Sequence, residues 1–177
     1  MVEHTRYTAF PHHSVCYAVG MKAGRRMLAY VLLLAAPFVA GAIGGFYTTP
    51  NIAAWYAYLV KPSWTPPSWV FGPVWTLLYL LMGIAAVLVW RMGKQGRARA
   101  LTVYGVQLVL NALWSVVFFG LHAPAVAFAV IIVLWLAIVW LIALFARHSR
   151  TAAWLLVPYL LWVTYAATLN LGIVLFN

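Results

Sequence analysis

The sequence predicts an all-α integral membrane protein, built as a bundle of five transmembrane helices. Hydrophobic residues make up 67% of the 177 residues and charged residues only 7%, against about 45–50% and about 25% in ordinary soluble domains. Five apolar runs each reach the length of about 20 residues that a helix needs to cross a hydrocarbon core. The chain has room for one such bundle and no second domain.

The chain begins with a polar stretch, residues 1–26, that lacks clear periodicity. We expect a flexible basic leader there, followed by a membrane domain over residues 27–177. The first span covers residues 27–47. A secretory signal is the alternative, because residues 39–42 are small enough for cleavage, but the apolar run has full spanning length.

Four further spans follow, and none of the five has Asp, Glu, Lys, Arg or His in its interior. They cover residues 69–90, 100–121, 124–146 and 152–176. Backbone groups in lipid must pair within each segment, and these runs are too long and too evenly apolar for barrel strands. Each is therefore predicted to be a helix, with local kinks at Pro37, Pro73 and Pro158.

The distribution of basic residues predicts the orientation of the bundle. Of the 11 Lys and Arg residues, all but Lys61 fall on one side when the chain crosses the membrane five times. Loops rich in Lys and Arg stay in the cytoplasm, so we expect a cytoplasmic N-terminus. The net charge of +10 does not indicate a nucleic-acid partner, because the basic residues interrupt apolar runs instead of lining one face.

Residues 61–75 contain three Trp and four Pro between two apolar runs, and we call them the Trp/Pro segment. Proline removes backbone donors and fixes φ, so the first half of this segment cannot be regular helix or central strand. Indoles on a stiffened loop suit a planar aromatic ligand, since little conformational entropy is lost on binding. An aromatic belt with a proline-rich turn at the membrane surface is the alternative.

A few uncharged polar residues lie inside the spans. Gln107, Asn111 and Trp114 follow helical spacing on one face, where they place amide donors and acceptors beside an indole. Hydrogen bonding between helices is the structural alternative. Trp75 in the second span and Trp162 in the fifth belong to aromatic stripes of similar spacing.

Ala166 lies one turn beyond Trp162, and a small residue beside large aromatic ones leaves a recess. Three aromatic faces that converge on one amide pair favour a ligand pocket. The only carboxylate side chain is Glu3, near the N-terminus, so no nucleophile–base–acid triad can form. The His residues lie in termini and loops, without the Cys or acidic partners that a metal site needs.

The chain resembles the translocator protein family, the tryptophan-rich sensory proteins related to the peripheral benzodiazepine receptor. The resemblance rests on these stretches in this order: Trp55-Tyr56, Lys61-Pro62-Ser63-Trp64-Thr65-Pro66-Pro67, Gly72-Pro73-Val74-Trp75, residues 107–114, Phe118-Phe119-Gly120, residues 158–162 and Thr168-Leu169-Asn170. It covers about residues 28–170. The leader lies outside it.

The resemblance implies a five-helix bundle, often a homodimer in the lipid bilayer, with a ligand pocket capped by the first loop. It also implies binding of porphyrins and other tetrapyrroles, and of isoquinoline or benzodiazepine-like drugs, without a required cofactor. Carried over by position, the pocket includes Tyr56, Trp75, Asn111, Trp114, Trp162 and Ala166. The sterol-recognition pattern of animal members, with a Tyr and a downstream Arg, is missing after Asn170, so a prokaryotic membrane is the expected location.

These observations lead us to expect a membrane receptor, sensor or carrier that stacks a tetrapyrrole between Trp75, Trp162 and loop indoles such as Trp64. Asn111 and Gln107 would be its polar anchors. The first alternative is an oxidative porphyrin-degrading enzyme with Trp75 and Trp162 as redox-active indoles, and the second is a scaffold for a partner complex. Lys61 is either an interfacial anchor or a partner for porphyrin propionates.

Overall fold

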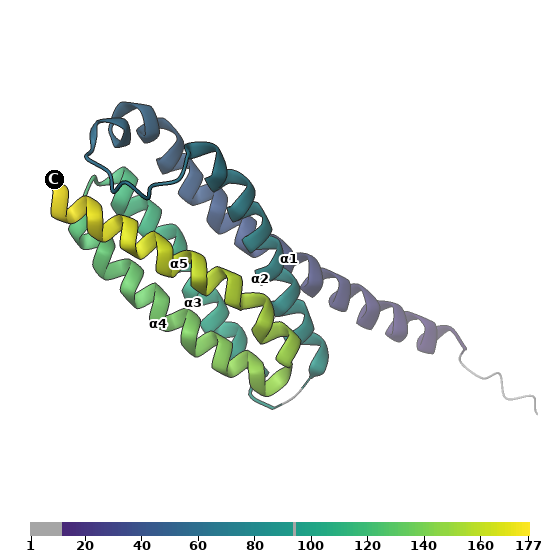
Figure 1. Ribbon diagram of the computed structural model, residues 1–177. Helices are drawn as coiled ribbons and strands as arrows, with labels where there is room; N and C mark the ends of the chain where they lie inside the picture. The colour runs from purple at the N-terminus through teal and green to yellow at the C-terminus, as the bar shows by residue number, and fades with distance from the viewer. Residues whose placement is uncertain (1–11, 94) are drawn as a thin grey trace, which may run out of the picture. The chain divides into compact units, whose positions relative to one another are not determined.

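A computed structural model describes residues 12–93 and 95–177, and it describes side chains from Gly24 onward, apart from residue 94. Every regular element among these residues is helical (Figure 1). The elements are α1 (His12–Ala54), η1 (Tyr56–Tyr58), η2 (Ser68–Val70), α2 (Phe71–Met92), α3 (Arg97–Ser115), η3 (Val116–Gly120), α4 (Pro124–His148) and α5 (Arg150–Phe176). Five of these helices are long and apolar enough to span a membrane, so the predicted fold class is confirmed.

The chain divides into two compact units, Met1–Leu32 and Leu33–Asn177. Within the first unit, the described residues form the N-terminal turns of α1. The helix therefore includes residues 12–26, which the sequence assigns to the leader, whereas the rest of that leader lies outside the described residues. The second unit contains the remainder of α1 and all other elements, and everything that follows concerns this unit.

Most helix boundaries agree with the sequence to within a few residues. α4 begins at Pro124 as predicted, and α5 ends at Phe176 as predicted. Two differences matter for the site. α1 continues to Ala54, beyond the expected end at residue 47, and α3 changes at Ser115 into the π-helical turn η3 instead of continuing to residue 121.

The prolines inside the helices remove backbone hydrogen bonds, and the neighbouring helices compensate for one of these losses. Pro37 has no N–H to donate to the carbonyl of Leu33, one turn earlier. The hydroxyl of Tyr104 in α3 donates to that carbonyl at 3.0 Å. Pro73 lies in the first turn of α2, where N–H groups have no partner within the helix, so it removes no bond. Partners of this kind are what allow proline in membrane helices.

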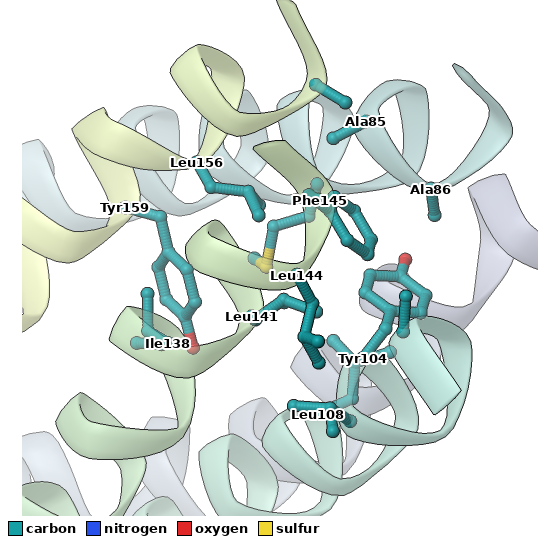
Figure 2. Close-up of a cluster of buried hydrophobic side chains, with 14 of the residues drawn as sticks. Ala85, Ala86, Tyr104, Leu108, Ile138, Leu141, Leu144, Phe145, Leu156 and Tyr159 are labelled. Carbon is teal, nitrogen blue, oxygen red and sulfur yellow. The ribbon is translucent and has the colours of Figure 1, made fainter. Parts of the chain in front are cut away.

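The core of the bundle lies between α2, α3, α4 and α5. Figure 2 shows part of this core, in which Ala85 and Ala86 of α2 belong to the same buried cluster as Tyr104 and Phe145. The α2 residues in this core recur at helical spacing, so one stripe of α2 is buried while side chains such as Leu77 stay exposed to the surroundings. Small residues on the buried stripe let neighbouring helices approach closely, which is how helices associate where the solvent is itself apolar.

Glycine allows α1 and α2 to approach at two levels. A Cβ added to Gly83 would lie 3.0 Å from the Cα of Leu34, and one added to Gly41 would overlap the ring of Tyr79. Gly41 therefore leaves the space that the Tyr79 ring occupies. This contact brings the wall of α1 against the aromatic stripe of α2.

Candidate ligand cavity

A cavity of about 690 Å³ lies inside the second unit, between the helices and the Trp/Pro segment. α1 contributes mainly small residues to its wall, and α2, η3 and α5 contribute aromatic ones. The aromatic residues of the wall are Tyr56, Phe71, Trp75, Tyr79, Trp114, Phe118, Phe119 and Trp162. Pocket volumes of about 300–1,000 Å³ are typical of sites for small organic ligands.

Six of the eight residues predicted for the site line this one cavity: Tyr56, Trp75, Asn111, Trp114, Trp162 and Ala166. The other two are placed differently. Trp64 is 52% exposed and contacts the rest of the site through its backbone carbonyl. Gln107 is fully buried, and its side chain bonds within the core instead of lining the cavity.

The indoles of the wall are held by ring contacts with their neighbours. The rings of Trp75 and Tyr79 stack at 5.3 Å with an interplanar angle of 30°. The rings of Trp114 and Phe118 also stack at 5.3 Å, at 26°. Offset stacking of this kind is favourable and restricts each ring to one orientation. The cavity therefore offers several flat, rigid, apolar faces.

A directional chain of hydrogen bonds leads from the cavity wall into the core. The hydroxyl of Tyr79 donates to Oδ1 of Asn111 at 3.4 Å, and Nδ2 of Asn111 donates to the hydroxyl of Tyr159 at 3.3 Å. Tyr159 in turn donates to Oε1 of Gln107 at 3.0 Å, and Nε2 of Gln107 lies 3.7 Å from the sulfur of Met82. Each hydrogen bond orients the next side chain in the series, so the amide of Asn111 is held in one orientation at the cavity wall.

Gln107 is missing from the cavity for a geometrical reason. It shares a helix face with Asn111, but it lies one turn, or about 6 Å, further along the α3 axis. At that level the fully buried ring of Tyr159 covers it. Helical spacing predicts which face a side chain is on, and it does not predict what covers that face.

Trp114 is oriented by Asn170, which the sequence places on the polar face of the last span. The indole Nε1 of Trp114 donates to Oδ1 of Asn170 at 3.1 Å, and Nδ2 of Asn170 donates to the carbonyl of Pro124 at 2.8 Å. Asn170 thus uses both ends of its amide to link α3, α4 and α5. Its role here is to position the Trp114 indole in the cavity wall.

The π-helical turn η3 places two adjacent aromatic residues, Phe118 and Phe119, in the cavity wall. The N–H of Leu121 bonds to the carbonyl of Val116 at 2.9 Å, a bond that spans five residues instead of four. In a regular helix, consecutive side chains point about 100° apart. The extra residue in the turn therefore changes the direction of the side chains that follow it. Sequence reasoning missed this turn.

The Nε1 atom of Trp162 is buried and has no hydrogen-bond partner among the described residues. The indole itself packs edge-on against Phe71 at 5.7 Å. A buried donor without an acceptor is costly, and such groups are found where strain, ligand binding or catalysis requires them. Trp162 lines the cavity, but its Nε1 atom is buried away from the cavity surface.

The Trp/Pro segment and Val60, which precedes it, are fastened to α5 and its C-cap residue Asn177 at three points, all toward the end of α5 where Figure 1 shows the C-terminus. The side chain of Asn177 accepts from the N–H of Val60 and donates to its carbonyl, both at 3.0 Å. The hydroxyl of Tyr165 donates to the carbonyl of Trp64 at 2.6 Å. Between these two bonds, the buried ring of Pro62 packs on Gly172 so closely that a Cβ there would overlap it. We call this set of contacts the loop latch.

Lys61 takes a role other than the two expected from the sequence. Its ammonium group donates to three backbone carbonyls, those of Tyr56, Ala57 and Leu59, at 3.0, 3.1 and 3.1 Å. An ammonium group has three protons, so these bonds use all of them. The cation also lies 5.0 Å from the centre of the Tyr56 ring. Lys61 therefore closes the 3₁₀ turn η1 and shapes the loop.

The cavity wall is mostly uncharged, and Lys61, whose ammonium group donates to three loop carbonyls, is the one charged residue in its lining. Burial and the nearby Tyr165 raise the pKa of Tyr56 above its ordinary value of 10.0, so this phenol is uncharged at neutral pH. Across residues 12–93 and 95–177, no group of three or more His, Cys, Asp or Glu side chains is arranged to hold a metal ion. Aromatic and other uncharged side chains therefore make up most of the surface that a ligand would meet.

Comparison with known proteins agrees with the fold. A sequence model of the TspO/MBR family matches residues 33–175. The chain is 41% identical to the tryptophan-rich protein TspO of Archaeoglobus fulgidus, over 85% of this chain and 98% of that protein. It is 45% identical to the tryptophan-rich sensory protein of Cereibacter sphaeroides, over 66% of this chain and 72% of that protein. Identity to the human translocator protein is 36%, over 76% of this chain and 82% of that protein. This chain is an integral multi-pass membrane protein that belongs to the TspO/MBR family.

Proposed function

We propose that this protein is a membrane receptor, sensor or carrier that encloses a porphyrin, or a drug-like isoquinoline or benzodiazepine ligand, in the cavity described above. The observation that carries the proposal is the convergence of six residues, selected from sequence, on one cavity of about 690 Å³. They come from η1, α2, α3 and α5. The names of two relatives, a sensory protein and a translocator protein, agree with this class of function.

The chemistry of the wall supports a planar ligand with few charges. Flat rings on Trp75, Trp114 and Trp162 would stack on a macrocycle, and such stacking is worth about 1–3 kcal/mol per base in the comparable nucleic-acid case. The amide of Asn111 would supply a directed hydrogen bond to a polar atom of the ligand. Ala166 keeps the space between the aromatic walls open.

The test is a titration of the purified full-length protein with protoporphyrin IX, followed by quenching of tryptophan fluorescence. We expect Trp75→Leu and Trp162→Leu each to weaken binding about ten-fold or more, from the stacking energy above. Trp154→Leu is the matched control, because that indole belongs to α5 but is 72% exposed and lies outside the cavity lining. Unchanged affinity in both cavity variants, with folding verified, would rule out this site.

Illumination of the same samples tests the enzymatic alternative. A receptor or carrier returns protoporphyrin unchanged, whereas an oxidative enzyme converts it into products with a different absorbance spectrum when light and oxygen are present. Loss of conversion in Trp162→Leu, at porphyrin concentrations that saturate the variant, would favour catalysis by this indole over simple binding. Equal, slow conversion with and without protein would exclude the enzyme.

We also propose a prokaryotic cell membrane, because the sterol-recognition pattern of animal members is missing after Asn170, and a cytoplasmic N-terminus, on the basis of the charge distribution. Ser63 in the Trp/Pro segment and Gln95 between α2 and α3 are both exposed and lie on opposite sides in this orientation. In a Cys16→Ser background, Ser63→Cys should react with an impermeant thiol reagent in intact spheroplasts. Labelling of Gln95→Cys instead would invert the orientation.

A further inference from the structure

The end of the bundle away from the loop latch carries five described arginines, Arg91, Arg97, Arg99, Arg147 and Arg150. They flank two connections, the one between α2 and α3 and the one between α4 and α5, which Figure 1 shows at the same end of the second unit. Four of the side chains are exposed and Arg97 is half-buried. We call these residues the arginine cluster.

Nothing in this part of the chain neutralises the cluster. The only Asp or Glu in the whole sequence is Glu3, outside the described residues, so no side-chain carboxylate exists between residues 12 and 177 to pair with an arginine. Like charges gathered without counter-charges repel one another and attract external anions. The counter-charge for the cluster has to come from another molecule.

Two of the guanidinium groups are held in place by tryptophans, Trp90 in the last turn of α2 and Trp140 about two turns before the end of α4. The guanidinium of Arg97 lies 4.2 Å from the ring centre of Trp90, and its Nη1 donates to the carbonyl of Trp90 at 3.0 Å. The guanidinium of Arg99 lies 5.4 Å from the ring centre of Trp140. A guanidinium has five N–H donors, so most donors of both groups remain free for an acceptor. These contacts pre-organise the arginines, which lowers the entropic cost of binding an anion.

The position of the cluster identifies the anion. Its residues lie at the ends of membrane-spanning helices, at the depth of lipid headgroups. Exposed apolar side chains adjoin them, among them Met92 next to Arg91 and Trp154 one turn after Arg150. Tryptophan in such places marks the level of the membrane interface. Guanidinium groups match the geometry of phosphate oxygens and can bind them through two parallel hydrogen bonds.

We propose that the arginine cluster is a binding surface for the phosphodiester headgroups of anionic phospholipids. It fixes the protein in an anionic membrane leaflet through Arg97, Arg99, Arg147 and Arg150. This surface is separate from the ligand cavity, whose lining contains none of these residues.

The test uses the full-length protein in phosphatidylcholine vesicles that contain traces of either spin-labelled phosphatidylglycerol or spin-labelled phosphatidylcholine. The motionally restricted fraction of each label gives its relative association with the protein. We expect a preference of about five-fold for phosphatidylglycerol, which corresponds to about 1 kcal/mol from one well-placed arginine. The preference should fall as salt rises, since the Debye length shortens from about 30 Å at 0.01 M to about 3 Å at 1 M.

Two double variants locate the effect. Arg97→Gln with Arg99→Gln, and Arg147→Gln with Arg150→Gln, should each lower the preference, and the two combined should abolish it. The second pair makes none of the tryptophan contacts described above, so it keeps the test valid if the first pair disturbs folding. Arg97→Lys with Arg99→Lys is the matched control, because it keeps the charge and removes the two-pronged geometry. It should lose part of the preference.

Three results would overturn the proposal. They are equal association of both labels with the wild-type protein, an undiminished preference in the combined variant, and displacement of the anionic label by inorganic phosphate or by a short RNA at low concentration. The last result would assign the cluster to a soluble anion. Protoporphyrin binding should be unchanged in the folded variants, so failure here is distinguishable from failure of the proposed function.

Discussion

Replacement of Gly172 by Ala tests whether the loop latch controls release of the ligand. Gly172 lies in α5 under the ring of Pro62, and an added Cβ would overlap Cγ of that ring and lie 3.4 Å from its Cβ and Cδ. A proline ring is part of the backbone and cannot rotate away. The methyl group must therefore push the Trp/Pro segment off α5.

Two opposing terms set the magnitude. Alanine is favoured over glycine inside a helix by about 1 kcal/mol, and overpacking a close contact costs about 1–3 kcal/mol. The free energy of unfolding should thus change little, by about 0–2 kcal/mol. The cost, however, falls only on the latched state of the loop. A loss of about 1–3 kcal/mol in that state should accelerate ligand dissociation by about 5- to 150-fold.

The assay is the dissociation rate of protoporphyrin. It is measured by recovery of tryptophan fluorescence when an excess of a porphyrin scavenger without tryptophan captures the released ligand. Gly105→Ala is the matched control, because Gly105 is also inside a helix but nothing lies within 4 Å of an added Cβ. That variant should gain stability and keep the wild-type rate. If Gly172→Ala dissociates no faster than Gly105→Ala, the latch does not restrain the ligand.

Three further predictions follow from single contacts. Tyr104→Phe removes the hydroxyl that donates to the carbonyl of Leu33, and this carbonyl has no partner in its own helix because of Pro37. The variant should lower the free energy of unfolding in detergent by about 1–2 kcal/mol. An unchanged free energy would mean that another donor replaces the hydroxyl. Lys61→Gln removes three hydrogen bonds to loop carbonyls and should lower the binding affinity for charged and neutral ligands equally. A loss of affinity for porphyrin dicarboxylates alone would show that Lys61 pairs with the ligand instead. Because the pKa of Tyr56 is raised in the folded state, its contribution to stability is complete below pH 10 and is lost as the pH rises through the pKa of the folded state. An alkaline titration that follows both phenolate absorbance and the free energy of unfolding should show this loss. Ionisation of Tyr56 at its ordinary pKa would contradict its burial.

The fold was predictable because a membrane allows few backbone structures and each of them has a recognisable sequence pattern. A run of about 20 apolar residues is a helix wherever the backbone must pair with itself. Proline suits the first position of a helix, which is why the start of α4 at Pro124 was found to the residue. Arg147 and Arg150 interrupt the apolar runs, and they predicted the position of the turn between α4 and α5.

The errors in the helix boundaries have local causes. The first span was expected to end at residue 47, but α1 continues past Pro50 to Ala54. The side chain of Asn51 donates to the carbonyl of Tyr47 at 2.8 Å and gives this last part of the helix an extra bond. The π turn η3 was not predicted from the sequence, and in the structure its residues Phe118 and Phe119 pack edge-on against Trp55.

The location of the site was predictable only as far as helical faces determine it. Asn111, Trp114 and Trp162 line the cavity, as their spacing suggested. Depth along an axis and the path of a loop were not predictable, and these decide the positions of Gln107 and Trp64. Gln107 is covered by another helix, and the Trp64 indole is exposed although its carbonyl is part of the loop latch.

α5 combines two tasks that are usually separate, the wall of the cavity and the anchor of its cover. Trp162 and Ala166 line the cavity, and Tyr165, which precedes Ala166 directly, donates to the loop carbonyl of Trp64. Gly172 continues the latch further along the same helix. The cavity wall and the contacts that hold the Trp/Pro segment therefore lie on one element, so a substitution that shifts α5 should alter both.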